Sequence, residues 1–122
     1  MKKPLLVSML LSASLTVLAP TSAPAFGAIA VDDNKAARGS AFAIVVNQDS
    51  AYKAAHAAVG RCRSNGGKNC RVVANFEKCG AFATSATAYG AGTGVRRKSA
   101  RNMALRNCGD DCEIVGVECE GE

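Results

Sequence analysis

Residues 54–79 read AAHAAVGRCRSNGGKNCRVVANFEKC, and this stretch determines how the chain folds. Its small apolar residues recur at helical spacing up to Cys62, a polar loop with two glycines follows, and a β-rich segment begins at Cys70. A degenerate copy, ARNMALRNCGDDCEIVGVEC, occupies residues 100–119. Every cysteine lies in one of the two copies, three in each. The chain is therefore organised as a duplication.

The duplication extends upstream, because GAFATS at 80–85 echoes GAIAVD at 27–32. Each copy then reads strand–strand–helix–strand, and a tight Lys78-Cys79-Gly80 link joins them antiparallel. We predict an α+β fold: one mixed sheet of about six strands with both helices on one face. The expected strands are 26–31, 41–46, 71–76, 80–85, 86–93 and 113–117, with a loop over 32–40. The expected helices run from an N-cap at Asp49 or Ser50 to about Arg63, and from about Arg96 to Asn107.

One face of each helix is expected to pack inward. The pattern places the first inward face on Ala51, Ala55, Ala58, Val59 and Cys62. The second is expected on Ala100, Met103, Ala104 and Cys108.

The first 25 residues have the pattern of a secretory signal peptide. Lys2 and Lys3 precede an apolar stretch over 5–18, and Ala23-Pro24-Ala25 supplies the small residues that signal peptidase accepts. The apolar stretch is shorter than the about 20 residues of a membrane span. We predict a single mature domain, 26–122, with repeats over about 27–79 and 80–119. It would be exported to the periplasm or the extracellular medium, without an integral membrane segment.

The charge balance argues against nucleic acid as the partner. Without Lys2 and Lys3, Lys+Arg falls from 15 to 13 against 10 Asp+Glu, which leaves about +3. A net charge this mild does not indicate nucleic-acid binding. We expect a monomer that binds a protein or an anionic component of the cell envelope.

Six cysteines in an exported domain of this size predict three disulfides. The repeat favours Cys62–Cys70 and Cys108–Cys112 as equivalent bonds between a helix end and the next strand. Cys79 and Cys119 each close a copy and form the natural pair between copies. Loop-closure entropy assigns these bonds roughly 2.5, 2 and 4 kcal/mol respectively. A core of Ala, Val and Ile without Trp needs such support.

These features together resemble a family of small exported bacterial proteins known only as domain of unknown function 4189. The resemblance covers about 26–119. It rests on the GAIA opening strand, the Ala88-Tyr89-Gly90-Ala91-Gly92 strand, the alanine-rich helix ending in cysteine, and Cys70-Arg71-Val72-Val73. The second helix departs from the pattern: Val95 replaces a capping Ser or Thr, and Arg96-Arg97-Lys98 fills a turn that is often acidic. The resemblance implies export and a disulfide-held fold, and it transfers no catalytic residue.

The sequence gives little support for a redox-active thiol, a zinc site or a catalytic histidine. No C-x-x-C spacing occurs, structural zinc needs four ligands, and the lone histidine, His56, is expected to face solvent. The acidic residues cluster in the 32–33 loop and at the C-terminal end, where solvated loops explain them better than a catalytic carboxylate pair. We therefore expect no cofactor, no metal and no catalytic residue.

The most informative local conflict lies at the start of the second helix. Gly90-x-Gly92-x-Gly94 matches neither a dinucleotide fingerprint nor a P-loop, and its glycines fit a bulge or close helix packing. The cations that follow oppose the helix dipole, and broken local rules tend to mark functional sites. An anion there would meet free N–H groups and positive side chains together. The hypothesis is an anion-binding site, for cell-wall polymer, phospholipid headgroup or acidic protein, formed by Arg96, Arg97, Lys98 and Arg101.

The sequence thus favours a small exported, non-enzymatic binding domain. Two other interpretations stay open: a secreted effector or inhibitor, and a small envelope glycan-acting enzyme with an unrecognised carboxylate site.

Overall fold

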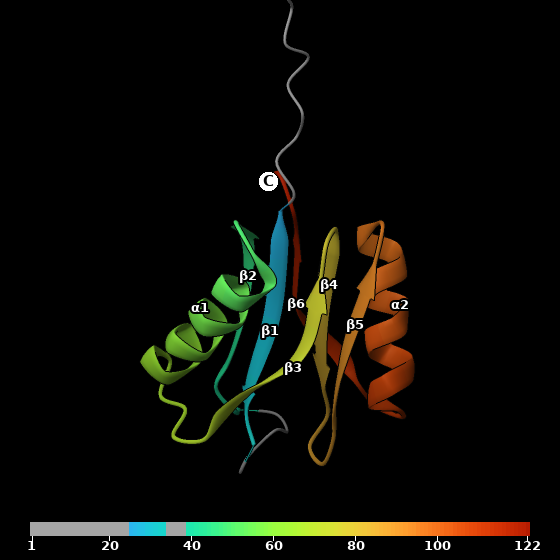
Figure 1. Ribbon diagram of the computed structural model, residues 1–122. Helices are drawn as coiled ribbons and strands as arrows, with labels where there is room; N and C mark the ends of the chain where they lie inside the picture. Colours follow the sequence, from blue (N-terminus) through green and yellow to red (C-terminus); the bar gives the residue numbers. More distant parts are fainter. Residues whose placement is uncertain (1–24, 34–38) are drawn as a thin grey trace, which may run out of the picture.

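The computed structural model describes residues 25–33 and 39–122 (Figure 1). Almost all of the predicted signal peptide, and most of the loop predicted over 32–40, lies outside these residues. The described elements are β1 (Phe26–Asp32), β2 (Phe42–Gln48), α1 (Ala51–Ser64), β3 (Cys70–Phe76), β4 (Cys79–Thr84), β5 (Tyr89–Gly94), α2 (Arg97–Cys108) and β6 (Glu113–Cys119).

Each copy of the repeat forms its own three-stranded sheet. β1 is central in the order β2-β1-β3, and β4 is central in the order β5-β4-β6. All four pairings are antiparallel. The α+β class is confirmed, but the single mixed sheet is wrong. The crossover through α1 does leave β2 and β3 parallel to each other; β1 simply lies between them.

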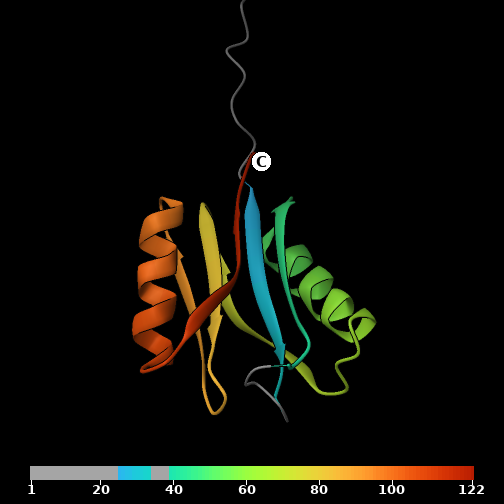
Figure 2. The same ribbon diagram turned by 180° about the vertical axis from the view of Figure 1, so that it is seen from behind.

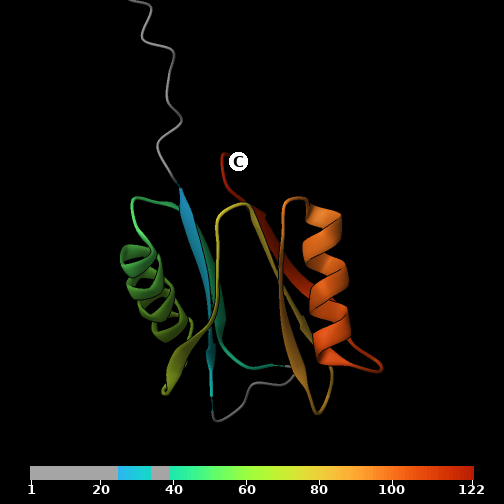
Figure 3. The ribbon, with the colours of Figure 1, turned by 45° about the vertical axis from the view of Figure 1, so that its right-hand side comes forward.

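The two sheets pack face to face, and the helices cover their opposite outer faces (Figures 1 and 3). β1 explains this arrangement because it is buried on both sides. Ala28 and Ala30 pack with α1, while Ile29 packs against the other sheet, beside Phe82 of β4. Helices on one face only, as predicted, would have left Ile29 in water. The hydrophobic effect therefore favours two sheets over one.

Small residues let each helix lie close to its sheet. Ala54, Ala58 and Cys62 are the buried residues of α1, and Ala100, Ala104 and Cys108 are those of α2. The predicted inward positions Ala51 and Met103 are exposed. Both residues lie beside the buried strip of their helix and outside it, because the packed face is narrower than the sequence pattern indicates. Ala55 and Val59 lie at its margin, half-buried.

Phe76 fills the layer between the sheets at the end of β3. A Cβ atom built on Gly27 or on Gly80 would lie 2.3 Å from its ring. The glycine that opens GAIAVD and GAFATS is therefore required by the same phenylalanine in both copies. From Phe76 the chain crosses to the second sheet, so β3 and β4 form no ladder with each other, contrary to the predicted antiparallel link.

The three disulfides join Cys62 to Cys70, Cys79 to Cys119 and Cys108 to Cys112. These are the pairs that the repeat favours. The second bond joins the last cysteine of each copy, but it does not connect the two sheets. Cys79 opens β4 and lies directly opposite Cys119 in the β4–β6 ladder, so this bond lies within one sheet.

Candidate functional site

The predicted cationic site lies at the start of α2, at the end of the sandwich where the chain terminates (Figures 1 and 2). Arg96 occupies the N-cap position with extended backbone. An arginine side chain has no acceptor for the free N–H groups of the first turn, unlike the Ser, Thr, Asp or Asn usual at this position. Ser99 bonds the Arg96 backbone instead: its Oγ accepts from Arg96 N at 3.2 Å and donates to Arg96 O at 2.9 Å.

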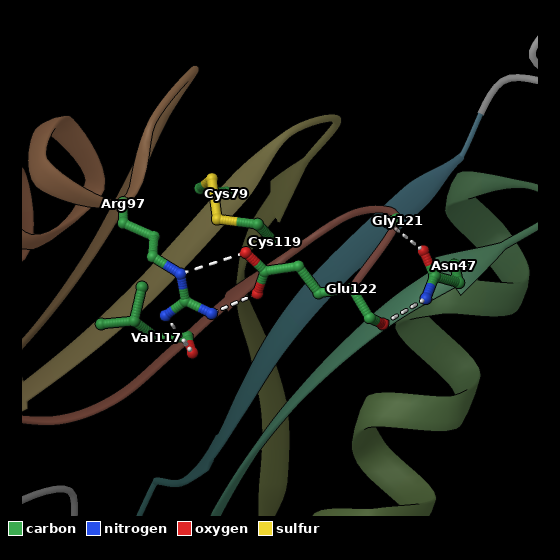
Figure 4. Close-up of polar contacts among 7 residues, drawn as sticks. All are labelled: Asn47, Cys79, Arg97, Val117, Cys119, Gly121 and Glu122. Atoms are coloured by element: carbon green, nitrogen blue, oxygen red, sulfur yellow. Dashed lines mark hydrogen bonds and ion pairs between the residues drawn. A yellow bond between two sulfur atoms is a disulfide. The ribbon is translucent and has the colours of Figure 1, made fainter.

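Arg97 is bound to a carboxylate of its own chain. Its Nε donates to Glu122 Oε1 at 3.1 Å, its Nη2 pairs with Glu122 Oε2, and its Nη1 donates to Val117 O at 3.4 Å (Figure 4). The hydrogen bonding of Arg97 to the Glu122 carboxylate, and then the charge of that carboxylate, raise the pKa of Arg97 above its ordinary value. The arginine and its acid are both about half exposed, so solvent screens the pair.

The structure therefore divides the predicted set. Arg97 is anchored to Glu122, whereas Arg96, Lys98 and Arg101 point into solvent at exposed positions. Within the described residues, no ion pair involves these last three side chains. Three cations without an ion-pair partner among the described residues therefore lie in the first two turns of α2 or just before it. The Glu122 carboxylate is already bound at the same helix start.

A short C-terminal segment, residues 120–122, connects this place to the first sheet. Asn47, at the end of β2, accepts a hydrogen bond from Gly121 N at 2.8 Å and donates from its Nδ2 to Glu122 O at 3.5 Å (Figure 4). Its backbone N–H donates to the Glu120 carboxylate. Asn47 has a φ of 61°, a left-handed conformation that asparagine tolerates better than most residues. The two C-terminal acids were predicted to be merely solvated; both are engaged in contacts with the fold.

No periodic pattern could have revealed the contacts of this segment with Asn47, since they join residues more than 70 positions apart. The one available signal was an asparagine directly after the strand expected over 41–46, because asparagine tolerates left-handed backbone better than most residues.

The glycines before α2 are explained by packing. A Cβ on Gly90 would lie 2.3 Å from Cys108 N, and one on Gly92 would lie 2.2 Å from Ala100 O and from Ala104 N. The backbone of α2 therefore rests directly on β5, and only glycine fits beneath it. Close helix packing, one of the two structural explanations offered for these glycines, accounts for this motif. The glycines need no ligand.

The remaining candidates hold few reactive groups. All six cysteines are in disulfides, so none is a thiol. His56 is exposed, as expected, and stacks on Tyr52 with ring centroids 6.0 Å apart. Within residues 25–33 and 39–122, no three His, Cys, Asp or Glu side chains are placed to hold a metal ion.

A second inter-sheet cluster lies at the edge strands β3 and β5. Arg71 donates from Nε to Asp33 Oδ1 at 2.6 Å and from Nη2 to the Tyr89 hydroxyl at 3.2 Å. The Asp33 hydrogen bond and charge raise the pKa of Arg71. This cluster links the two sheets at the edge formed by β3 and β5, opposite the edge formed by β2 and β6. The charge of Arg71 is already neutralised by Asp33.

Comparisons with known proteins agree with this fold. The NMR structure of Rv1813c from Mycobacterium tuberculosis is similar, with a TM-score of 0.57 and 25% sequence identity over 79% of this chain and 75% of that one. No curated protein matches the sequence. Neither α1 nor α2, the helices of the described residues, is long and apolar enough to cross a membrane. The family profile described as Domain of unknown function (DUF4189) matches residues 26–119. This match spans nearly the whole described chain, and the chain belongs to that family.

Proposed function

We propose that this protein is a small exported binding domain, without catalytic activity, that recognises an anionic partner through the start of α2. The observation that carries the proposal is the Arg97–Glu122 pair. A carboxylate of the chain itself occupies this place, with two guanidinium nitrogens directed at it. Carboxylate groups of a partner would meet the same chemistry at the neighbouring cations.

The charges are arranged for a polymer or an extended acidic surface. Arg96, Lys98 and Arg101 lie within two turns of helix, and each is exposed. Several weak contacts to repeated anionic groups add through effective concentration. The positive end of the helix dipole supports them, although it disfavours the cations when no anion is present. An anionic envelope polymer or an acidic protein has the required repetition.

Three disulfides support a location outside the cytoplasm, where such bonds persist. Export through the predicted signal peptide at 1–25 would bring the domain to the polymers of the envelope.

A charge-matched pair of variants tests the proposal. The site variant is Arg96→Ser, Lys98→Ala and Arg101→Ala; it leaves Arg97 on Glu122 and adds a capping hydroxyl that supports the fold. The control variant replaces three exposed cations elsewhere by alanine and removes the same net charge: Lys68, Lys78 and Arg106.

Binding to poly-L-glutamate and to phosphatidylglycerol vesicles would be measured over a range of salt concentrations. We expect the site variant to bind more weakly and with a shallower salt dependence, and the control to behave like the native protein. Equal losses in both variants would mean that only net charge matters, and no native binding to either probe would refute the proposal.

A further inference from the structure

A groove of about 380 Å³ lies between α1 and β3, on the opposite outer layer from α2. Its volume falls within the roughly 300–1,000 Å³ typical of small-molecule sites. The α1 residues that line it recur at helical spacing, in a strip beside the buried face. The lining consists of Tyr52, Ala55, His56, Val59, Gly60, Arg63 and, from β3, Val72.

An aromatic platform forms one end of this groove. The Tyr52 and His56 rings are stacked, 6.0 Å apart and inclined by 17°, and Tyr52 is 77% exposed. The fold does not require them. When the copies are aligned on Cys62 and Cys108, the equivalent residues of α2 are Lys98 and Asn102, and α2 packs on its sheet in the same way.

Gly60 is a second feature without a packing reason. It lies inside α1, where glycine is the least favourable residue after proline. A Cβ atom at this position would meet nothing within 4 Å, in contrast to Gly90 and Gly92 under α2. Because Gly60 has no side chain, the helix backbone is accessible from the groove. This accessibility does not stabilise the fold, but it lets a ligand approach the helix closely.

Arg63 supplies a positive charge at the other end of the strip. It is exposed, and among the residues that the structure describes it forms no ion pair. A helix rises 1.5 Å per residue, so Tyr52 and Arg63 are separated by about 16 Å along the axis. The planar guanidinium fork is suited to a carboxylate.

We infer that this groove binds an oligosaccharide that carries carboxylate groups. Sugar rings have flat C–H faces, which suit the Tyr52–His56 platform, and hydroxyl edges, which suit the phenol and imidazole. A carboxylate further along the same ligand reaches Arg63. The 16 Å length exceeds one ring, so an oligomer fits better than a monosaccharide. This site is separate from the start of α2, and either one stands without the other.

The test uses the full oxidised protein and a galacturonic acid tetramer, followed by calorimetry and by amide chemical shifts. The fully methyl-esterified tetramer has the same rings without charge, and hexaglutamate has charge without rings. We expect the acid tetramer to shift amides of α1 and β3. Tyr52→Ala should weaken its binding at least about tenfold. Arg63→Gln should lower the affinity for the acid tetramer until it approaches the affinity for the methyl-esterified tetramer.

Two variants separate this role from a structural one. Gly60→Ala should raise the melting temperature while weakening the tetramer, a combination that mere damage to the fold cannot produce. Asn102→Ala, at the position in α2 equivalent to His56, should leave tetramer binding unchanged. The inference is overturned if the tetramer shifts only residues of α2, if hexaglutamate binds α1 equally well, if Tyr52→Ala retains full affinity, or if an apolar peptide occupies the groove and the tetramer does not.

Discussion

The contact between α2 and β5 predicts that Gly92→Ala will destabilise the protein severely. The new methyl carbon would lie 2.2 Å from Ala100 O and from Ala104 N, where ordinary contact begins at 3.4 Å, so α2 must recede by about 1.2 Å. Both obstructing atoms belong to backbone and cannot rotate away. The shift separates the buried alanines of α2 from the sheet against which they pack.

Overpacking of this kind costs about 1–3 kcal/mol, and an obstruction by backbone places the expected loss near the upper value, about 3 kcal/mol. For a domain of this size, the melting temperature should fall by roughly 12–24 °C. Thermal and urea unfolding followed by circular dichroism, with disulfides intact, measure the loss. Gly60→Ala is the matched control: the same methyl group enters open space in a helix interior and should stabilise by up to about 1 kcal/mol. Neutral surface substitutions change the free energy of unfolding by up to about 0.5 kcal/mol. If the free energy of unfolding of Gly92→Ala lies within that range of the native value, α2 does not lie as close to β5 as described.

Three further predictions concern the helix cap, the disulfides and the C-terminal segment. Ser50→Ala removes the acceptor of Lys53 N and should cost about 1 kcal/mol in urea unfolding; no change would mean that the hydroxyl does not cap α1. Replacing both cysteines of Cys79–Cys119 by alanine should cost about 4 kcal/mol, against about 2 kcal/mol for Cys108–Cys112, because the closed loops span 40 and 4 residues; a reversed order in calorimetry would contradict the loop-entropy argument. Glu122→Gln releases Arg97 and should strengthen poly-L-glutamate binding while the melting temperature hardly changes, and weaker binding would show that the pair orders the site instead of competing for it.

The sequence predicted the local features of the fold well. Cysteines at repeated spacing led to the three bonds, and Ser50, one of the two predicted caps, begins α1. Most of these features depend on residues close in the chain, whose geometry follows from helix and strand periodicity. The Cys79–Cys119 pair follows instead from the equivalence of the two copies.

The arrangement of the sheets required information that periodicity does not contain. The continuous apolar run of β1 indicates two buried faces, and either a helix or another sheet can cover each of them. The side chains of Ile29 and Phe82 meet only because each copy forms its own sheet and the two sheets pack together. The Arg97–Glu122 contact was equally inaccessible, because it joins two exposed side chains 25 residues apart. The sequence offered a bulge or close helix packing for the glycines of β5, and it could not choose between them because their neighbour, α2, lies above them only in three dimensions.

None of the three disulfides crosses the layer between the two sheets. Cys62–Cys70 lies in the half formed by the first sheet and α1, and both other bonds lie in the half formed by the second sheet and α2. The copies are joined by apolar contacts, by polar contacts such as those of Asn47, and by the short connection after Phe76. Oxidation therefore fixes each half internally while leaving the halves free to part without breaking a covalent bond. Two fully oxidised chains can exchange halves across this layer, so a domain-swapped dimer would keep every disulfide of the monomer.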